Sequence, residues 1–214
     1  MEGVEDIPET VLAEGMDFTW ESFPEYLDTL AGMSRVMDIG AQVPHATLRF
    51  YVMGERGADH AEQPTDDEIA EMGRLLEESL HAGALGFTTS RTIKHTAADG
   101  RSTPTLSAAE PELVGMALAM KRAGKGVIEV NSDFGEGDFA TLRQAAELAG
   151  RPLSVLLLQV DNAPDLWRET LGQIEQANAD GLHVTGQGGS RFIGMVMGLE
   201  TTINPFASHQ AWQE

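Results

Sequence analysis

The stretch RAGKGVIEVNSDFGEGDFATLRQAAELAGRPLSVLLLQ, residues 122–159, contains the pattern that decides the fold. Two nearly continuous apolar runs, near residues 126–131 and 153–159, flank a segment with helical spacing that ends at Gly150. Continuous apolar runs are typical of parallel strands that are buried on both faces, and a glycine just after the last helical residue is a common helix stop. The stretch therefore predicts two parallel strands joined by a helix.

The same unit recurs on both sides of this stretch, and strands are predicted near residues 36–43, 84–89 and 182–187. The helical segment before the second strand begins with Thr65 as a possible N-cap and ends at Gly83. An open doubly wound sheet and an arc of a (β/α)₈ TIM barrel both fit this α/β pattern. About five consecutive similar units, with no phosphate-loop glycine pattern, favour the partial barrel. We expect a lead-in over residues 1–20, βα repeats over 21–189 and a C-terminal tail over 190–214.

Composition and charge exclude several classes of function. The 214 residues carry 34 acids against 14 bases, for a formal net charge of −20, which disfavours nucleic acid and anionic membranes as partners. Cysteine is absent, which excludes disulfides and thiolate metal sites within these residues. The longest apolar run, LSVLLLQV from Leu153, is too short to cross a bilayer. Because the acidic first residues lack a signal-peptide pattern, a cytoplasmic protein is predicted.

Candidate binding residues follow from the rule that parallel α/β folds place their chemistry at the carboxyl ends of the strands. Two long loops, near residues 45–64 and 90–106, are predicted on that side, where loops that enclose a substrate belong. The hydroxyls and guanidinium of the segment 88–91 could recognise a carboxylate, or could be ordinary turn residues. The predicted substrate-binding residues are His45, Arg49, Thr88, Thr89, Ser90, Arg91, Asn131 and Gln159.

The six histidines do not have the spacing of a metal site, since neither His-x-His nor His-Glu-x-x-His occurs. His45, which follows a predicted strand, faces a substrate or is bonded to a neighbouring carbonyl. The other histidines are predicted to be solvent-facing or structural, or to lie at the non-catalytic end of a strand: His60, His81, His95, His183 and His209.

Four longer segments carry a family resemblance: MEGVEDIPETVLAEGMDFTWESFPEYLDTL (1–30), GAQVPHATLRFYVMGERGA (40–58), AGALGFTTSRT (82–92) and GLETTINPFASH (198–209). Together they resemble the N-acyl-D-amino-acid deacylase (D-aminoacylase) group of amidohydrolases, of the amidohydrolase family 3 type, over essentially the whole chain. PHATLR is similar to the Gly-His-Ser-x-Leu-Arg segment of that family, which places His45 and Arg49 on its positions. GALGFTTSR is similar to a family turn that brings Thr88 and Thr89 with it.

The resemblance implies a distorted (β/α)₈ barrel of the metallo-dependent hydrolase type. It also implies hydrolysis of the C–N bond of linear amides, such as N-acyl-D-amino acids, by zinc-activated water. A small N-acylated molecule is the implied substrate. The family's His-x-His pair, metal-binding cysteine and catalytic aspartate are expected outside these residues. Where the family has histidines at two successive strand ends, this chain has Asn131 and Leu157, with Gln159 just beyond. No metal ligand and no catalytic residue can therefore be assigned from the resemblance.

Three expectations stay open at this point. The chain is a segment of a metal-dependent amidohydrolase, a truncated α/β segment without turnover, or an acidic module that binds a small molecule. Five strands cannot close a barrel, so open sheet edges predict marginal solubility or self-association.

Overall fold

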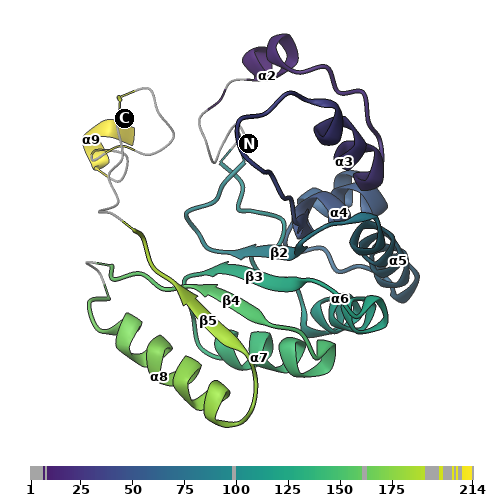
Figure 1. The fold of residues 1–214 in the computed structure, drawn as a ribbon. Coiled ribbons are helices and arrows are strands. Elements are labelled where there is room, and N and C mark those ends of the chain that lie inside the picture. Colours follow the sequence, from purple (N-terminus) through teal and green to yellow (C-terminus); the bar gives the residue numbers. More distant parts are fainter. Residues whose placement is uncertain are drawn as a thin grey trace.

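One parallel sheet forms the centre of the protein, as a computed structural model shows (Figure 1). The structure describes residues 7, 9–97, 100–160, 163–190, 198–199, 204, 206 and 209–213. Five strands pair in chain order, and every pair is parallel. They are β1 (Val43–Pro44), β2 (Gly86–Arg91), β3 (Val127–Ser132), β4 (Leu153–Leu156) and β5 (Val184–Gln187).

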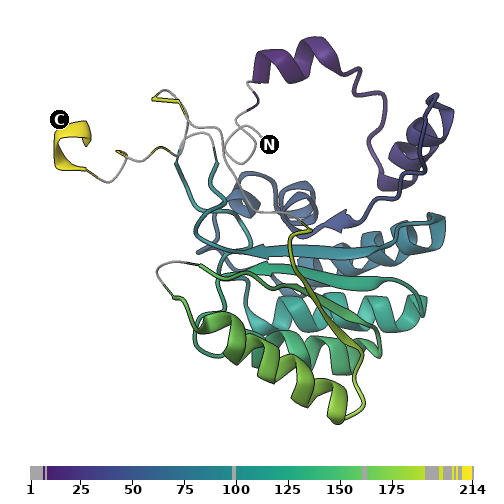
Figure 2. The ribbon, with the colours of Figure 1, turned by 60° about the vertical axis from the view of Figure 1, so that its left-hand side comes forward.

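The strand order decides between the two predicted architectures. A doubly wound sheet reverses its strand order at a switch point, whereas here each strand pairs with the next one along the chain. The helices between strands lie along one face of the sheet, which Figure 2 shows for the last three of them. The predicted α/β fold, a partial TIM barrel, is confirmed. These helices are α5 (Asp66–Ala82), α6 (Glu110–Ala123), α7 (Asp138–Ala149) and α8 (Leu166–Ala179).

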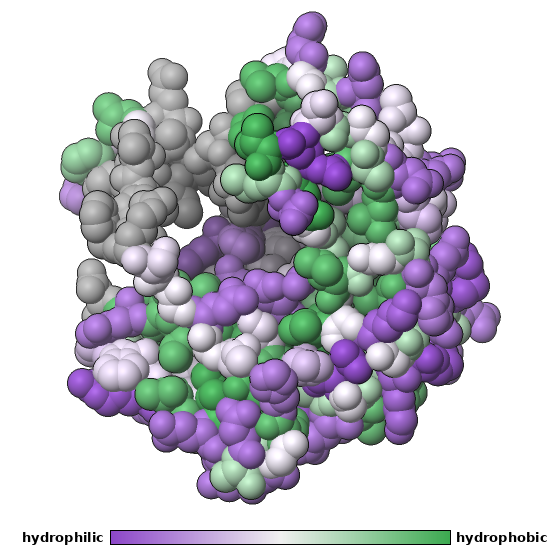
Figure 3. Space-filling model, viewed as in Figure 1, coloured by the Kyte–Doolittle hydropathy of each residue, from purple (hydrophilic) through white to green (hydrophobic). Residues whose placement is uncertain are grey.

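Local sequence signals set where these helices begin and end. The Thr65 hydroxyl accepts a hydrogen bond from the Glu68 amide, and the Glu68 carboxylate accepts one from the Thr65 amide, which forms a capping box. Helices α6 and α7 end at Gly124 and Gly150, which have φ angles of 65° and 60° that favour glycine. Between helices and sheet lies one apolar core. The outward surface of α5 and α6, at the right of Figure 3, is mostly hydrophilic.

The first predicted strand and the loop after it need correction. The strand predicted over residues 36–43 is reduced to β1, because the main chain meets β2 only from Ala41, whose carbonyl accepts a hydrogen bond from the Leu85 amide. The predicted loop 45–64 begins instead with helix α4 (His45–Met53) and the 3-10 helix η1 (Gly54–Ala58). The fourth strand ends at Leu156, earlier than predicted. By contrast, the predicted loop 90–106 is largely irregular beyond Arg91.

The remaining described helices are α2 (Glu9–Gly15), α3 (Phe23–Gly32) and α9 (Gln210–Gln213). Much of the predicted lead-in and tail lies outside the described residues, and the predicted division at residues 20 and 189 stays a prediction. Along the described part of the chain, no helix has the length and apolar character needed to cross a bilayer.

The two faces of the sheet differ in chemistry. On the face covered by the helices, the strand side chains belong to the apolar core and include Phe87, Val130 and Val155. Because side chains alternate along a strand, the next residues face the other side. The paired register there brings together the row Thr88, Glu129, Ser154 and Thr185. Two residues further along β2 and β3, on the same face of the sheet, Ser90 pairs with Asn131.

Candidate functional site

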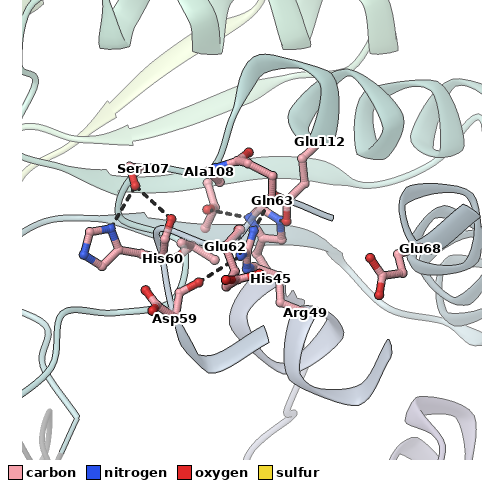
Figure 4. Close-up of polar contacts among 12 residues, drawn as sticks. His45, Arg49, Asp59, His60, Glu62, Gln63, Glu68, Ser107, Ala108 and Glu112 are labelled. Atoms are coloured by element: carbon pink, nitrogen blue, oxygen red, sulfur yellow. Dashed lines mark hydrogen bonds and ion pairs between the residues drawn. The ribbon is translucent and has the colours of Figure 1, made fainter. Parts of the chain in front are cut away.

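A fully buried polar cluster joins α4, α6 and β2 (Figure 4). His45 Nε2 lies 2.8 Å from Glu112 Oε1, and His45 Nδ1 lies 3.0 Å from Thr89 Oγ1. Arg49 donates from Nη1 to the other carboxylate oxygen of Glu112. The side chains of His45, Arg49 and Glu112 have no exposed surface. The cluster therefore connects elements far apart in the sequence without contacting solvent.

Arg49 also holds the chain segment that follows η1. Its Nη2 donates to the main-chain carbonyls of Asp59 (3.2 Å) and Glu62 (2.7 Å). Burial alone would raise the pKa of Glu112, but hydrogen bonds and charges from His45 and Arg49 outweigh burial and lower that pKa. In this arrangement the two predicted residues of the PHATLR segment support the fold from inside. Direct contact of either with a substrate stays a prediction.

We expect this cluster to make the protein acid-labile. The folded-state pKa of Glu112 lies below its usual value of 4.5, so its contribution to stability is present above that pH and is lost as pH falls through the folded pKa. Urea unfolding between about pH 6 and pH 3 would measure the loss. Other carboxyl groups with lowered pKa values also lose stabilising energy as pH falls, so a Glu112→Gln variant serves as the reference. The free energy of unfolding of this variant should fall less between about pH 6 and pH 3 than that of the parent chain. Parallel plots of that free energy against pH for the two proteins would contradict the prediction.

A second polar group lies at the carboxyl ends of β2 and β3. Ser90 Oγ lies 2.6 Å from Nδ1 of His95, and Asn131 Nδ2 lies 3.4 Å from Nε2 of the same ring. All three residues are half-buried. Ser90 and Asn131 were predicted site residues, whereas His95 was predicted to be solvent-facing or structural. The signal that could have singled it out is its place in the long loop that follows β2.

Hydrogen bonds fix the loop that carries His95. Thr105 Oγ1 donates to the main-chain carbonyl of Ser90 (2.6 Å), and the Thr103 amide donates to that of His95 (3.0 Å). Asp133, just beyond β3, accepts from the Thr92 hydroxyl and the Ile93 amide, both at 2.8 Å. The ring of His95 is thus held over the ends of two strands.

The other predicted site residues lie elsewhere. Arg91 faces the helix side, where it pairs with Asp138 (3.0 Å) and donates to the carbonyl of Ala108 (2.9 Å). Thr88 belongs to the opposite face, and Gln159 is exposed just beyond β4. The structure therefore brings Ser90 and Asn131 together, groups Thr89 with the buried cluster, and does not unite all the predicted residues in one site.

A hollow of about 180 Å³ opens beside Asn131, at the carboxyl ends of β3 and β4. Its lining is mostly apolar, with Lys94 and Asp133 among its polar residues. A larger hollow of about 400 Å³ lies between α3, α4 and α5 and is lined in part by Trp20, Phe23 and Tyr26. None of the predicted site residues lines it, so we take the smaller hollow as the candidate site.

The described residues do not fit a zinc ion. Among them, no group of three or more histidine, cysteine, aspartate or glutamate side chains is placed to hold a metal. Asn131 offers an amide, which is a weak zinc ligand. Leu157 packs against the apolar core, on the helix side of the sheet. The two strand ends to which the resemblance assigns histidines thus carry no ligand for zinc.

Comparison with known proteins gives a consistent result. The model described as "Amidohydrolase family" matches residues 1–212. A D-aminoacylase of Alcaligenes xylosoxydans xylosoxydans is 30% identical over 178 residues, which cover 80% of this chain and 34% of that protein. An N-acyl-D-glutamate deacylase of the same organism is 31% identical over 166 residues, covering 74% and 31% respectively. The chain thus spans about a third of the length of these relatives. No solved structure matches it at a significant level.

Proposed function

The chain belongs to the amidohydrolase family, and from this premise we propose that the protein hydrolyses the amide C–N bond of small N-acylated amino acids. The match over residues 1–212 is the observation that carries the proposal. The names of the two deacylase relatives support the substrate class. The D configuration of the amino acid is part of the same proposal.

The polar group at the strand ends supplies chemistry that suits this reaction. Amide hydrolysis needs hydrogen-bond donors for the carbonyl oxygen and a group that moves protons to the leaving nitrogen. Ser90 and Asn131 are donors at the carboxyl ends of neighbouring strands, and the imidazole of His95 lies within hydrogen-bond reach of both. We propose that these side chains bind and orient the amide beside the hollow.

Three finer features belong to the proposal as well. Zinc dependence is implied by the resemblance, although the described residues provide no group of three or more histidine, cysteine, aspartate or glutamate side chains that could hold the ion. A cytoplasmic location is expected from the sequence. Self-association is supported by the exposed apolar side chains of Val36, Met37 and Ile39 beside the short edge strand β1.

Hydrolysis is tested with the chain itself. N-acetyl-D-methionine, N-acetyl-L-methionine and N-acetyl-D-glutamate are incubated with the protein, with and without added Zn²⁺, and release of free amine is measured. We expect release that falls at least about a hundredfold in a His95→Ala variant, the lower end of the usual range of general acid–base contributions. A His60→Ala variant, which removes a half-buried imidazole bonded to Ser107, should retain the rate. Equal rates in the two variants would contradict the role of His95.

Binding without turnover is the second candidate function. It is favoured by Asn131 and Leu157 at the strand ends to which the resemblance assigns histidines. Ligand-induced stabilisation without amine release in any of these assays would support it over hydrolysis.

A further inference from the structure

The contacts of His95 have a direction. Because the amide nitrogen of Asn131, 3.4 Å from Nε2 of His95, can only donate, we assign Nε2 as the acceptor and place the ring proton on Nδ1. Nδ1 then donates to Ser90 Oγ at 2.6 Å. Since the oxygen of Ser90 accepts this bond, its own hydroxyl proton is available to a further acceptor. Asn131, His95 and Ser90 thus form a relay of donors that ends in an oriented hydroxyl.

The hollow beside this relay has a matching shape and chemistry. Asn131 belongs to both the relay and the lining of the hollow. At the mouth, Lys94 lies 3.8 Å from Asp133, and its side chain is 60% exposed. A volume of about 180 Å³ is small beside the roughly 300–1,000 Å³ of sites that enclose whole drug-sized ligands. It suits one apolar portion of a ligand. The apolar residues of the lining are Ile93, Phe134, Leu156, Leu157, Leu158, Val160, Ala163 and Leu166.

We propose that the hollow is an acyl-group pocket, in which Ser90 Oγ donates to the amide carbonyl oxygen of an N-acylated ligand whose short aliphatic acyl chain enters the apolar lining. The carboxylate of the same ligand then lies toward Lys94 at the mouth. The choice of ligand class rests on the proposed function, whereas the pocket and the relay rest on the contacts of this chain. Acyl-chain length is therefore the property that this pocket selects.

Calorimetric titration of the whole chain with N-acetyl-, N-butanoyl-, N-hexanoyl- and N-dodecanoyl-D-alanine tests the pocket. Each methylene buried in the hollow should tighten the dissociation constant about fourfold. We expect affinity to increase over the short chains and to fall for dodecanoyl, which exceeds the volume. Ala163→Phe, which fills part of the hollow, should move the optimum to a shorter chain. Affinity that is independent of acyl length, or no binding, would overturn the proposal.

The relay is tested with matched hydroxyl deletions. Ser90→Ala should weaken every ligand of the series about fivefold, because a single hydrogen bond to a neutral carbonyl is lost. Ser154→Ala removes a buried hydroxyl that has no hydrogen-bond partner among the described residues, and it should leave affinity unchanged. Equal effects of the two variants would refute the role of Ser90. If affinity has an optimum acyl-chain length but no amine is released, the proposed hydrolysis is contradicted and the acyl-group pocket is not. If amine is released but affinity has no optimum acyl-chain length, the acyl-group pocket is contradicted and the hydrolysis is not.

Discussion

Replacing Glu112 with leucine is expected to lower the free energy of unfolding by about 3–5 kcal/mol, the usual loss when one partner of a buried ion pair is removed. Glu112 is the acceptor for both His45 and Arg49 in a cluster with no exposed side chain. Without the carboxylate, the guanidinium of Arg49 stays buried with no opposite charge. The carbonyls of Asp59 and Glu62 satisfy part of its hydrogen bonding but do not neutralise it.

Urea unfolding followed by circular dichroism measures the loss. The matched control is Glu110→Leu, two residues earlier in α6, where the exposed side chain accepts a hydrogen bond from Gln144 (2.8 Å). That variant should change stability by less than about 1 kcal/mol. A double variant, Arg49→Met with Glu112→Leu, should recover part of the loss because a buried ion pair can often be replaced by apolar side chains. A loss of under about 1 kcal/mol, or a double variant no better than the single one, would contradict the assignment.

Much of the sheet could be predicted from the sequence because its signals are local. The strands over residues 127–132 and 184–187 lie within or beside the apolar runs that predicted them. Gly83 and Gly150 end their helices as expected. Such signals need no knowledge of distant partners, so pattern alone finds them.

The region before β2 was predicted less well because its pattern is ambiguous. Val36, Met37 and Ile39 are residue types that favour a strand, yet their side chains are exposed. The backbone of this segment pairs with no described strand. In α4, the buried residues are His45, Leu48, Arg49 and Met53. Since two of these are polar, the buried stripe of the helix did not appear as an apolar stripe in the sequence.

The candidate site depends on distances that the sequence does not contain. Thr88, Thr89, Ser90 and Arg91 are contiguous, but the alternation of a strand sends them to opposite faces. Glu112 went unnoticed because an acid in the first turn of a helix is common at a surface. Its partners, His45 and Arg49, are 67 and 63 residues away. The fold places α4 beside β2 and the first turn of α6, which brings these side chains together.

Gly86→Ala should be nearly as damaging, with a loss of at least about 3 kcal/mol, the upper part of the range for overpacking. Gly86 opens β2 and pairs with Val127 of β3. A Cβ atom at this position would lie 2.0 Å from the main-chain oxygen of Val127 and 2.7 Å from its nitrogen. Because these are backbone atoms between paired strands, relief requires the two strands to separate. The strand ends that carry Ser90 and Asn131 lie on the same pair, so ligand binding should weaken together with stability.

Gly172→Ala provides the matched control for the same chemical change. Gly172 lies in the exposed interior of α8, and a Cβ there would have no neighbour within 4 Å. Alanine should stabilise this helix by about 0.5–1 kcal/mol. Urea midpoints of the two variants are compared with that of the parent chain. Amide hydrogen exchange at Val127, whose amide donates to the carbonyl of Leu85 (3.1 Å), reports whether β2 and β3 have separated. A Gly86→Ala chain that keeps the parent midpoint and the slow exchange of β3 would show that the strands do not approach as closely as the structure has them.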